Sequence, residues 1–155
     1  MSDSIVFCSS QRFRKPLGDF IANFRQLLVN YGMFVEILEP EFENRPDSFT
    51  NLTEAERLKK DATYRAGVAG AVFEHLCKKV FPARRCLIFN KDGYIGFNTG
   101  GELFAAFSLG KICYALDDRM LIGDYAAGNL HEEPSARKLI HAVVPTPEEL
   151  IKRFL

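Results

Sequence analysis

Several features that would place this chain of 155 residues in a special class are missing from its sequence. Lysine plus arginine and aspartate plus glutamate balance at 20 each, which argues against a surface that binds nucleic acid polymers over the whole protein. Every apolar run is far shorter than the roughly 18 residues of a membrane span. The first ten residues lack the basic region of a signal peptide. We therefore expect a cytoplasmic protein whose partners include neither nucleic acid polymers nor membranes.

Cysteine and histidine are scarce and lack the spacing of metal ligands. The sequence contains no Cys-x-x-Cys pair, and its three histidines show no ligand spacing. Three of the four cysteines fall inside apolar, strand-like runs. This pattern predicts buried thiols in a reducing compartment, with no metal site and no redox cofactor. The four cysteines are Cys8, Cys77, Cys86 and Cys113.

Short apolar runs rich in strand-forming residues alternate with helical patterns along the chain. We expect strands at residues 4–8, 33–38, 85–90, 111–116 and 139–144. Such alternation predicts an α/β fold, with a doubly wound, five-stranded, mainly parallel sheet and helices on both faces, in a flavodoxin-like or Rossmann-like layout. The length suits one domain over residues 1–155.

The spacing of apolar residues and the capping residues indicate where helices form. One apolar face runs from Leu17 to Tyr31 and ends at Gly32, a residue suited to the position just after a helix. Thr53 and Glu56 match a capping box that opens a helical region ending before Pro82. Residues 39–49 are expected to form a loop. Residues 117–138 look irregular, with room for one short helix, and a last helix begins after residue 146.

In an open parallel sheet, ligands bind beyond the carboxyl ends of the strands. Three predicted loops emerge there: residues 9–15, 90–101 and 117–120. The first carries the hydroxyls of Ser9 and Ser10 and the cation Arg12 before a helix, a combination that suits a phosphate or another anion. A solvated basic turn is the alternative interpretation.

The second loop, NKDGYIGFNTGG, is the richest in glycine. Gly93, Gly96, Gly100 and Gly101 would let the backbone turn tightly and approach a ligand. Their spacing is not that of a dinucleotide-binding loop, and the lysine of a triphosphate-binding loop is missing.

Glu102 follows this glycine loop and admits two interpretations. Thr99 and Glu102 match a capping box, in which Glu102 would only stabilise the start of a helix. Alternatively, Glu102 is a nucleophile that the positive end of the helix dipole keeps ionised, and that attacks a sugar C1′ to form a glycosyl ester.

Residues 92–111, DGYIGFNTGGELFAAFSLGK, resemble the glycine loop and glutamate-bearing helix of the nucleoside 2-deoxyribosyltransferase-like superfamily. The resemblance extends to residue 114 and rests on the following positions: Gly93, Tyr94, Ile95, Gly96, Thr99, Glu102, Leu103, Ala106, Gly110, Lys111, Ile112 and Tyr114.

The resemblance implies that Glu102 is the nucleophile and that Asn90 is a polar site residue at the end of the third strand. It also implies cleavage or exchange of the glycosidic bond of a (deoxy)nucleoside or nucleoside 5′-monophosphate, in a homodimer or larger homo-oligomer. Asp92 is a candidate general acid, although a turn-forming role competes with it. The candidate substrate contacts are Phe7, Ser9, Ser10, Arg12, Asn90, Tyr94, Gly96, Asn98 and Asp117. Of these, Phe7 and Tyr94 could instead pack in the core.

Two other classes of function stay open at this point. The chain could be a non-catalytic nucleotide-binding or sensory domain that has the pocket without the chemistry. It could also have a purely structural or interaction role, with Glu102 as a helix cap.

Overall fold

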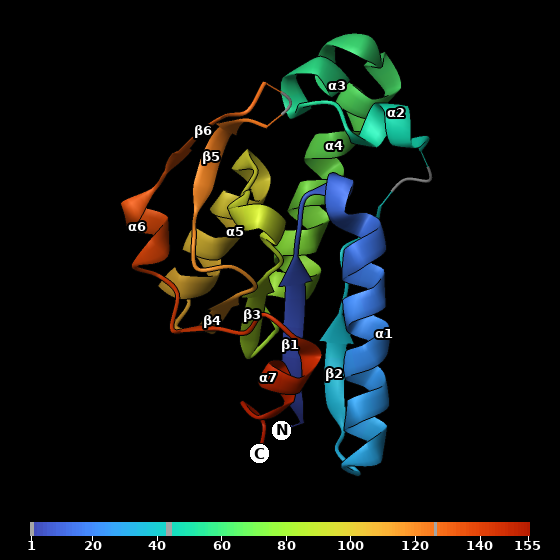
Figure 1. Ribbon diagram of the computed structural model, residues 1–155. Coiled ribbons are helices and arrows are strands. Elements are labelled where there is room, and N and C mark those ends of the chain that lie inside the picture. The colour runs from blue at the N-terminus through green and yellow to red at the C-terminus, as the bar shows by residue number, and fades with distance from the viewer. Residues whose placement is uncertain (1, 43–44, 126) are drawn as a thin grey trace.

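The computed structural model describes residues 2–42, 45–125 and 127–155 (Figure 1). A five-stranded parallel sheet in the order β2-β1-β3-β4-β7 forms its centre, as the sequence predicted. The strands are β1 (Asp3–Cys8), β2 (Val35–Leu38), β3 (Arg85–Ile88), β4 (Ile112–Ala115) and β7 (Ala142–Val143). The last strand is shorter than the six-residue run expected for it.

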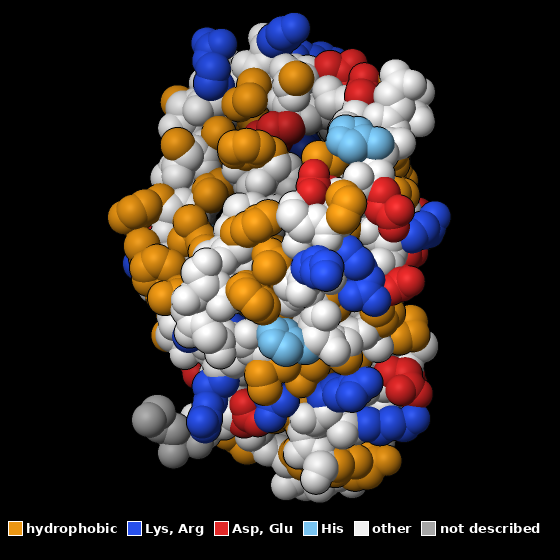
Figure 2. Space-filling model, turned by 90° about the vertical axis from the view of Figure 1, so that its left-hand side faces the viewer, with side chains coloured by type: hydrophobic (Ala, Val, Ile, Leu, Met, Phe, Trp, Pro, Cys, Tyr) orange, Lys and Arg blue, Asp and Glu red, His pale blue; other side chains and the backbone are white. Residues whose placement is uncertain are grey.

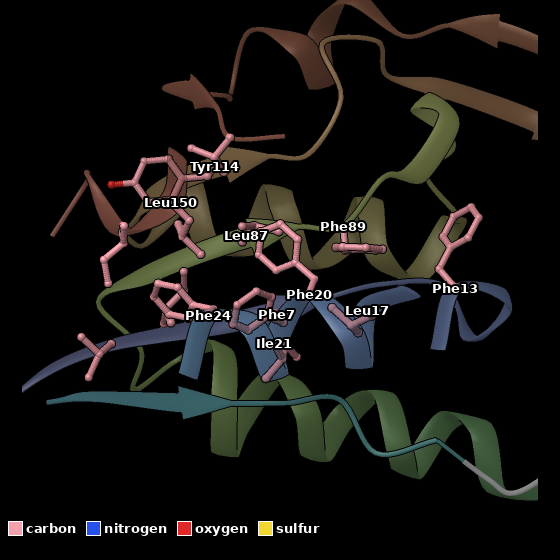
Figure 3. Close-up of a cluster of buried hydrophobic side chains, with 14 of the residues drawn as sticks. Phe7, Phe13, Leu17, Phe20, Ile21, Phe24, Leu87, Phe89, Tyr114 and Leu150 are labelled. Atoms are coloured by element: carbon pink, nitrogen blue, oxygen red, sulfur yellow. The ribbon is translucent and has the colours of Figure 1, made fainter. Parts of the chain in front are cut away.

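Helices cover both faces of this sheet. Successive residues of β1 point to opposite faces, so Ile5 and Phe7 belong to one core cluster while Val6 and Cys8 belong to the other. The first cluster, rich in aromatic rings, packs α1 (Arg14–Asn30) and α7 (Pro147–Ile151) on the sheet (Figure 3). The second cluster packs α5 (Phe97–Ser108) on the other face. The fold is therefore a doubly wound α/β domain.

The helical region that opens at Thr53 is divided rather than continuous. The capping box of Thr53 and Glu56 forms at the start of α3 (Glu54–Lys60). The backbone is extended at Asp61, whose side chain then caps α4 (Ala62–His75). A π-helical turn, η2 (Leu76–Val80), continues from α4. His75 thus lies where the helical geometry changes.

One short helix and one hairpin were not expected from the sequence, whereas a second short helix lies in the segment 117–138, where there was room for one. Helix α2 (Asp47–Thr50) occupies the end of the predicted loop, of which residues 43 and 44 lie outside the described part. The segment predicted to be irregular forms an antiparallel hairpin of β5 (Leu121–Asp124) and β6 (Asn129–Glu132), followed by α6 (Pro134–Arg137). The hairpin escaped prediction because its strands are only four residues long and largely exposed.

Across the described ranges, no helix combines the length and the apolar character that crossing a bilayer requires.

Candidate functional site

Helix α5 begins three residues earlier than the sequence predicted, at Phe97 rather than Gly100. Gly96 is its N-cap, so Thr99 is the third helical residue and Glu102 the sixth. The expected capping box of Thr99 and Glu102 is therefore wrong, because Glu102 lies in the second turn, beyond reach of the unpaired amides at the helix start. Within the described chain, Glu102 has no role as a cap.

A cavity of about 210 Å³ lies between the loop after β1, the segment that follows β2, helices α3 and α4, and the start of α5. Two of the loops that the sequence singled out thus meet in one place. The cavity is lined by six of the predicted site residues: Ser9, Ser10, Tyr94, Gly96, Asn98 and Glu102.

Glu102 lies at the buried side of this cavity, with only 7% of its surface exposed. Burial disfavours the charged carboxylate and raises the pKa of Glu102 to about 7, although the thiol of Cys8 works in the opposite direction. The direction of this shift is opposite to the expected effect of the helix dipole, because burial outweighs it. The charge of Glu102 instead changes near neutral pH, where a general base or nucleophile is often poised.

His75 and Cys8 are the polar neighbours of Glu102 within the described residues. The Nε2 atom of His75 lies 3.9 Å from the Glu102 carboxylate and 3.6 Å from the Cys8 Sγ. Burial, together with the charge of Lys79, lowers the pKa of His75 to about 4, so the imidazole is neutral at pH 7. The Nδ1 atom of His75 is buried and has no hydrogen-bond partner in the part of the chain that the structure describes.

Cys8 ends β1 and is completely buried beside this pair. The nearby Cys86 thiol favours the Cys8 thiolate, but burial and the Glu102 carboxylate outweigh it and raise the pKa of Cys8 to about 12. Cys86 and Cys113 are buried too, and all four cysteines are free thiols. The sequence-based expectation of buried thiols is confirmed for three of the four, since Cys77 is only half-buried.

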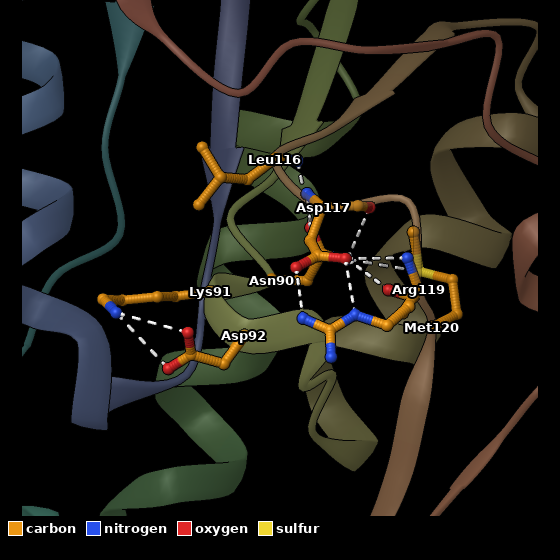
Figure 4. A network of polar contacts seen from close by, with 7 residues as sticks. All are labelled: Asn90, Lys91, Asp92, Leu116, Asp117, Arg119 and Met120. Atoms are coloured by element: carbon orange, nitrogen blue, oxygen red, sulfur yellow. Dashed lines mark hydrogen bonds and ion pairs between the residues drawn. The ribbon is translucent and has the colours of Figure 1, made fainter.

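Asn90 has a structural role in place of the expected contact with a ligand (Figure 4). Its Nδ2 donates to the carbonyl oxygens of Asp117 (3.0 Å) and Arg119 (2.7 Å). Its Oδ1 accepts from the backbone amides of Leu116 and Asp117, both at 3.0 Å. The side chain is fully buried, so it ties the end of β3 to the chain after β4.

Asp92 and Asp117 also lie outside the cavity lining. Asp117 forms a 2.7 Å ion pair with Arg119. Asp92 forms an exposed ion pair with Lys91 and has a positive φ of 56°, which supports the turn-forming interpretation over the acid (Figure 4). Gly93, next to it, has φ +82°, and a Cβ there would lie 2.9 Å from that of Arg119. Glycine is therefore required at this position of the loop, whereas Gly100 and Gly101 lie in the helix.

Two further predicted contacts lie away from the cavity. Phe7 is fully buried and makes edge contacts with Phe20 and Phe24, so it belongs to the core (Figure 3). Arg12 donates from Nη2 to the Leu52 carbonyl oxygen and stacks 4.0 Å from the ring centre of Tyr125. The Nε atom of Arg12 is buried without a hydrogen-bond partner among the described residues.

The structure adds cavity residues that the sequence did not reveal, chiefly His75 and Arg57. Arg57 is buried, pairs with Glu54 at 3.0 Å and contributes a positive charge to the lining. Its Nε atom is unpartnered within the described ranges. No local pattern in the sequence indicates that Arg57, which follows an ordinary capping box, is buried in a cavity. The same holds for His75, which ends a mostly exposed helix.

No protein-family model matches this chain, and a comparison with curated proteins finds no match. The assignment of a function therefore depends on the cavity and on the residues that line it.

Proposed function

We propose that this protein belongs with the nucleoside 2-deoxyribosyltransferase-like enzymes and cleaves or exchanges the glycosidic bond of a nucleoside or nucleoside 5′-monophosphate. The observation that carries the proposal is the position of Glu102. Glu102 is held by a helix on the sheet and lines the cavity together with Ser9 and Ser10 from the loop after β1.

In the proposed reaction, a carboxylate oxygen of Glu102 attacks C1′ of the sugar. The bond from C1′ to the base nitrogen breaks, and the base leaves and takes up a proton from water. Water or a second base then attacks C1′ of the glycosyl ester and releases Glu102. Because the nucleophile must be ionised and burial raises the pKa of Glu102 to about 7, the rate should increase with pH and level off above that value.

The cavity offers groups that suit the rest of such a substrate. Ser9 and Ser10 can accept and donate hydrogen bonds to sugar hydroxyls, and Tyr94 presents an aromatic ring. Arg57 is the lining residue that suits an anionic substituent such as a 5′-phosphate, which would compete with Glu54 for its guanidinium. No metal or redox cofactor takes part in this scheme.

A second candidate is a nucleotide-binding domain without catalytic activity. One observation favours it: the candidate general acid Asp92 and the expected polar site residue Asn90 do not line the cavity and are engaged elsewhere. A role in protein interaction alone gives no reason for the buried carboxylate of Glu102, because an isolated buried charge destabilises a fold.

Incubating the protein with a panel of nucleosides and 5′-monophosphates and measuring free base by chromatography separates these candidates. We expect base release by the wild-type protein and by Glu36→Gln, a matched control on the exposed side of β2. Glu102→Gln should release none. A wild-type protein that binds a nucleotide but releases no base would support the non-catalytic candidate instead.

We also propose that the protein forms a two-fold dimer through the outer side of α4. Ala66, Ala69, Gly70 and Phe73 are exposed and do not line the cavity, and 67% of the Phe73 surface is accessible. Exposed phenylalanines on α5 add apolar surface, and Figure 2 shows hydrophobic side chains spread over the face that carries α5, α6 and the hairpin. Such surface favours association.

Light scattering at micromolar concentration tests the dimer. Phe73→Asp should convert it to a monomer, whereas Val29→Asp, at an exposed apolar position of α1 on the opposite side of the sheet, should not. A monomeric wild-type protein would contradict the proposal.

A further inference from the structure

We propose that Cys8, His75 and Glu102 form a binding site for a soft divalent cation, with Zn²⁺ as the best fit. The Sγ of Cys8, an imidazole nitrogen of His75 and a carboxylate oxygen of Glu102 all lie within 4.8 Å of one another. All three residues are buried. Thiolate, imidazole and carboxylate are the donor types that zinc takes in proteins.

The distances between donors approach those around a tetrahedral ion. Zinc–ligand bonds of about 2.0–2.3 Å separate a sulfur and a nitrogen ligand by about 3.6 Å, and a nitrogen and an oxygen ligand by about 3.4 Å. In the structure, the Cys8 Sγ is 3.6 Å from the His75 Nε2, and that nitrogen is 3.9 Å from the Glu102 carboxylate. The nitrogen–oxygen distance is about half an ångström longer than expected, a difference that a small change of the Glu102 side-chain torsions can remove.

The donors come from three different elements, each fixed by packing. Cys8 ends β1, His75 ends α4 where the π-helical turn begins, and Glu102 lies in the second turn of α5. Two of the three, His75 and Glu102, line the cavity, while Cys8 is fully buried. A bound ion would therefore keep its fourth position open toward the cavity, for water or a ligand, as zinc sites with three protein ligands do.

Charge balance also favours the ion. The cation replaces the proton of the Cys8 thiol, which leaves as H⁺, so that thiolate and carboxylate together balance the two positive charges. His75 binds through the lone pair of Nε2, and the ring proton stays on Nδ1. Without an ion, no lysine or arginine of the described chain pairs with Glu102.

Occupancy of this site and glycosyl transfer exclude each other at Glu102. This consequence rests on the proposed function, since a carboxylate oxygen bound to zinc is no longer free to attack C1′. Zinc would then inhibit base release at a concentration set by its affinity for the three residues.

Titration of chelator-treated protein with Co²⁺, followed by displacement with Zn²⁺, tests the site without any nucleoside. We expect one Co²⁺ per chain, a sulfur-to-cobalt charge-transfer band in the near ultraviolet and the visible bands of a tetrahedral ion. Cys8→Ser, which is nearly isosteric, should lose the charge-transfer band and weaken binding by more than about 100-fold, because even loss of an outer partner costs 10–100-fold. His75→Gln should weaken binding similarly.

The controls are Cys113→Ser, another buried thiol, and His131→Gln, an exposed histidine, and both should bind Co²⁺ like the wild type. Circular dichroism verifies that each variant is folded. Binding without a charge-transfer band, equal binding by Cys8→Ser, or no binding at micromolar Co²⁺ would each overturn the proposal.

Measuring base release with added Zn²⁺ separates this proposal from the enzymatic one. Zinc should inhibit the wild type, a chelator should reverse the inhibition, and Cys8→Ser should need more Zn²⁺ relative to its own metal-free rate. A protein that binds Co²⁺ as described but cleaves no nucleoside refutes only the enzymatic function. A protein that cleaves nucleosides but binds no ion refutes only the metal site.

Discussion

Two buried polar clusters lie near the same edge of the sheet, and they differ in how fully their hydrogen bonds are satisfied. The side chain of Asn90 uses both of its ends, with four backbone partners at 2.7–3.0 Å. In the cluster of Cys8, His75 and Glu102, the Nε2 of His75 lies 3.6 Å from the thiol and 3.9 Å from the carboxylate, and the Nδ1 of His75 has no partner among the described residues.

The comparison separates a network that stabilises the fold from a cluster that has capacity left to bind a ligand. A saturated network has no capacity left for a ligand and contributes stability, whereas an unsatisfied buried group is a cost that a ligand, an ion or a reaction can offset. A polar residue at the carboxyl end of a strand is thus a weak predictor of a site until its hydrogen bonds are known. Asn90 lies at the carboxyl end of a strand, where ligands are expected, but both ends of its side chain are already hydrogen-bonded to the backbone.

The largest difference between the two clusters is expected in the effect of substitutions on base release. Glu102→Gln should reduce base release by at least about 10³-fold, as expected when a group acting only in the transition state is removed. Its free energy of unfolding, measured at pH 4.5, should stay within about 1 kcal/mol of the wild type, because the buried carboxyl is protonated in the folded state at that pH and glutamine keeps its shape. Kinetics and urea denaturation measure the two quantities. Retention of full activity would refute the role of Glu102.

The opposite pattern is expected for Asn90. Asn90→Ala leaves two backbone amides and two carbonyl oxygens unpaired in the interior, so the free energy of unfolding should decrease by about 4 kcal/mol. Co²⁺ binding by the fraction that remains folded should be unchanged. Urea denaturation measures the loss. A variant that unfolds like the wild type would show that the network is dispensable.

The pH dependence of stability gives a third contrast, measured with chelator present. The pKa of Glu102 is raised from 4.5 to about 7, so this group makes the free energy of unfolding decrease as the pH rises between these values. The pKa of His75 is lowered from 6.5 to about 4, so this group makes the free energy of unfolding increase as the pH rises between about 4 and 6.5. The two nearly cancel in the wild type, within the interval they share.

Glu102→Gln removes the contribution of Glu102 to this pH dependence and leaves that of His75. The free energy of unfolding of the variant should increase by about 3 kcal/mol as the pH rises from 4 to 6.5, whereas that of the wild type should change much less. Lys79 and Glu41 also face His75, so the profile is compared with that of Glu36→Gln, whose charge change lies far from the cluster. Parallel profiles for the two variants would contradict the assignment of the shifts.

The smallest expected effect compares the two Thr-x-x-Glu motifs. Thr53→Ala removes a real cap, since the Thr53 hydroxyl accepts from the Glu56 amide, and should cost about 1 kcal/mol. Thr99→Ser, which keeps the hydroxyl of a buried helical residue, should cost about as much as one lost methyl group. Thermal unfolding measures both. A Thr53→Ala variant as stable as the wild type would show that this cap adds nothing.

The sequence predicted the fold well because the sheet strands are continuous apolar runs and the helix from Leu17 to Tyr31 has one apolar face. These signals are local. The start of α5 was predicted incorrectly, because Thr99 and Glu102 match a capping box in letters while Gly96, three residues earlier, is the actual N-cap. The hairpin gave no signal, since its short strands are exposed and show no alternation.

The site was predictable only in part. Ser9, Ser10 and Glu102 follow from the rule that ligands bind at the carboxyl edge of a parallel sheet, and the structure brings them to one cavity. His75 meets Cys8 across a separation of 67 residues, which no local pattern records. Asp92 and Asp117 have the right chemistry and the right position along the chain. In the structure they form ion pairs with Lys91 and Arg119 and do not line the cavity.

The strand order β2-β1-β3-β4-β7 has a consequence for biosynthesis. Each strand that leaves the ribosome after β1 adds to an outer edge of the strands already made, and no strand has to insert between two earlier ones. The sheet can therefore grow outward as the chain emerges, consistent with the folding of amino-terminal segments first. The cluster of Cys8, His75 and Glu102 closes only when α5 is complete, so the nascent chain has a sheet before it has a site.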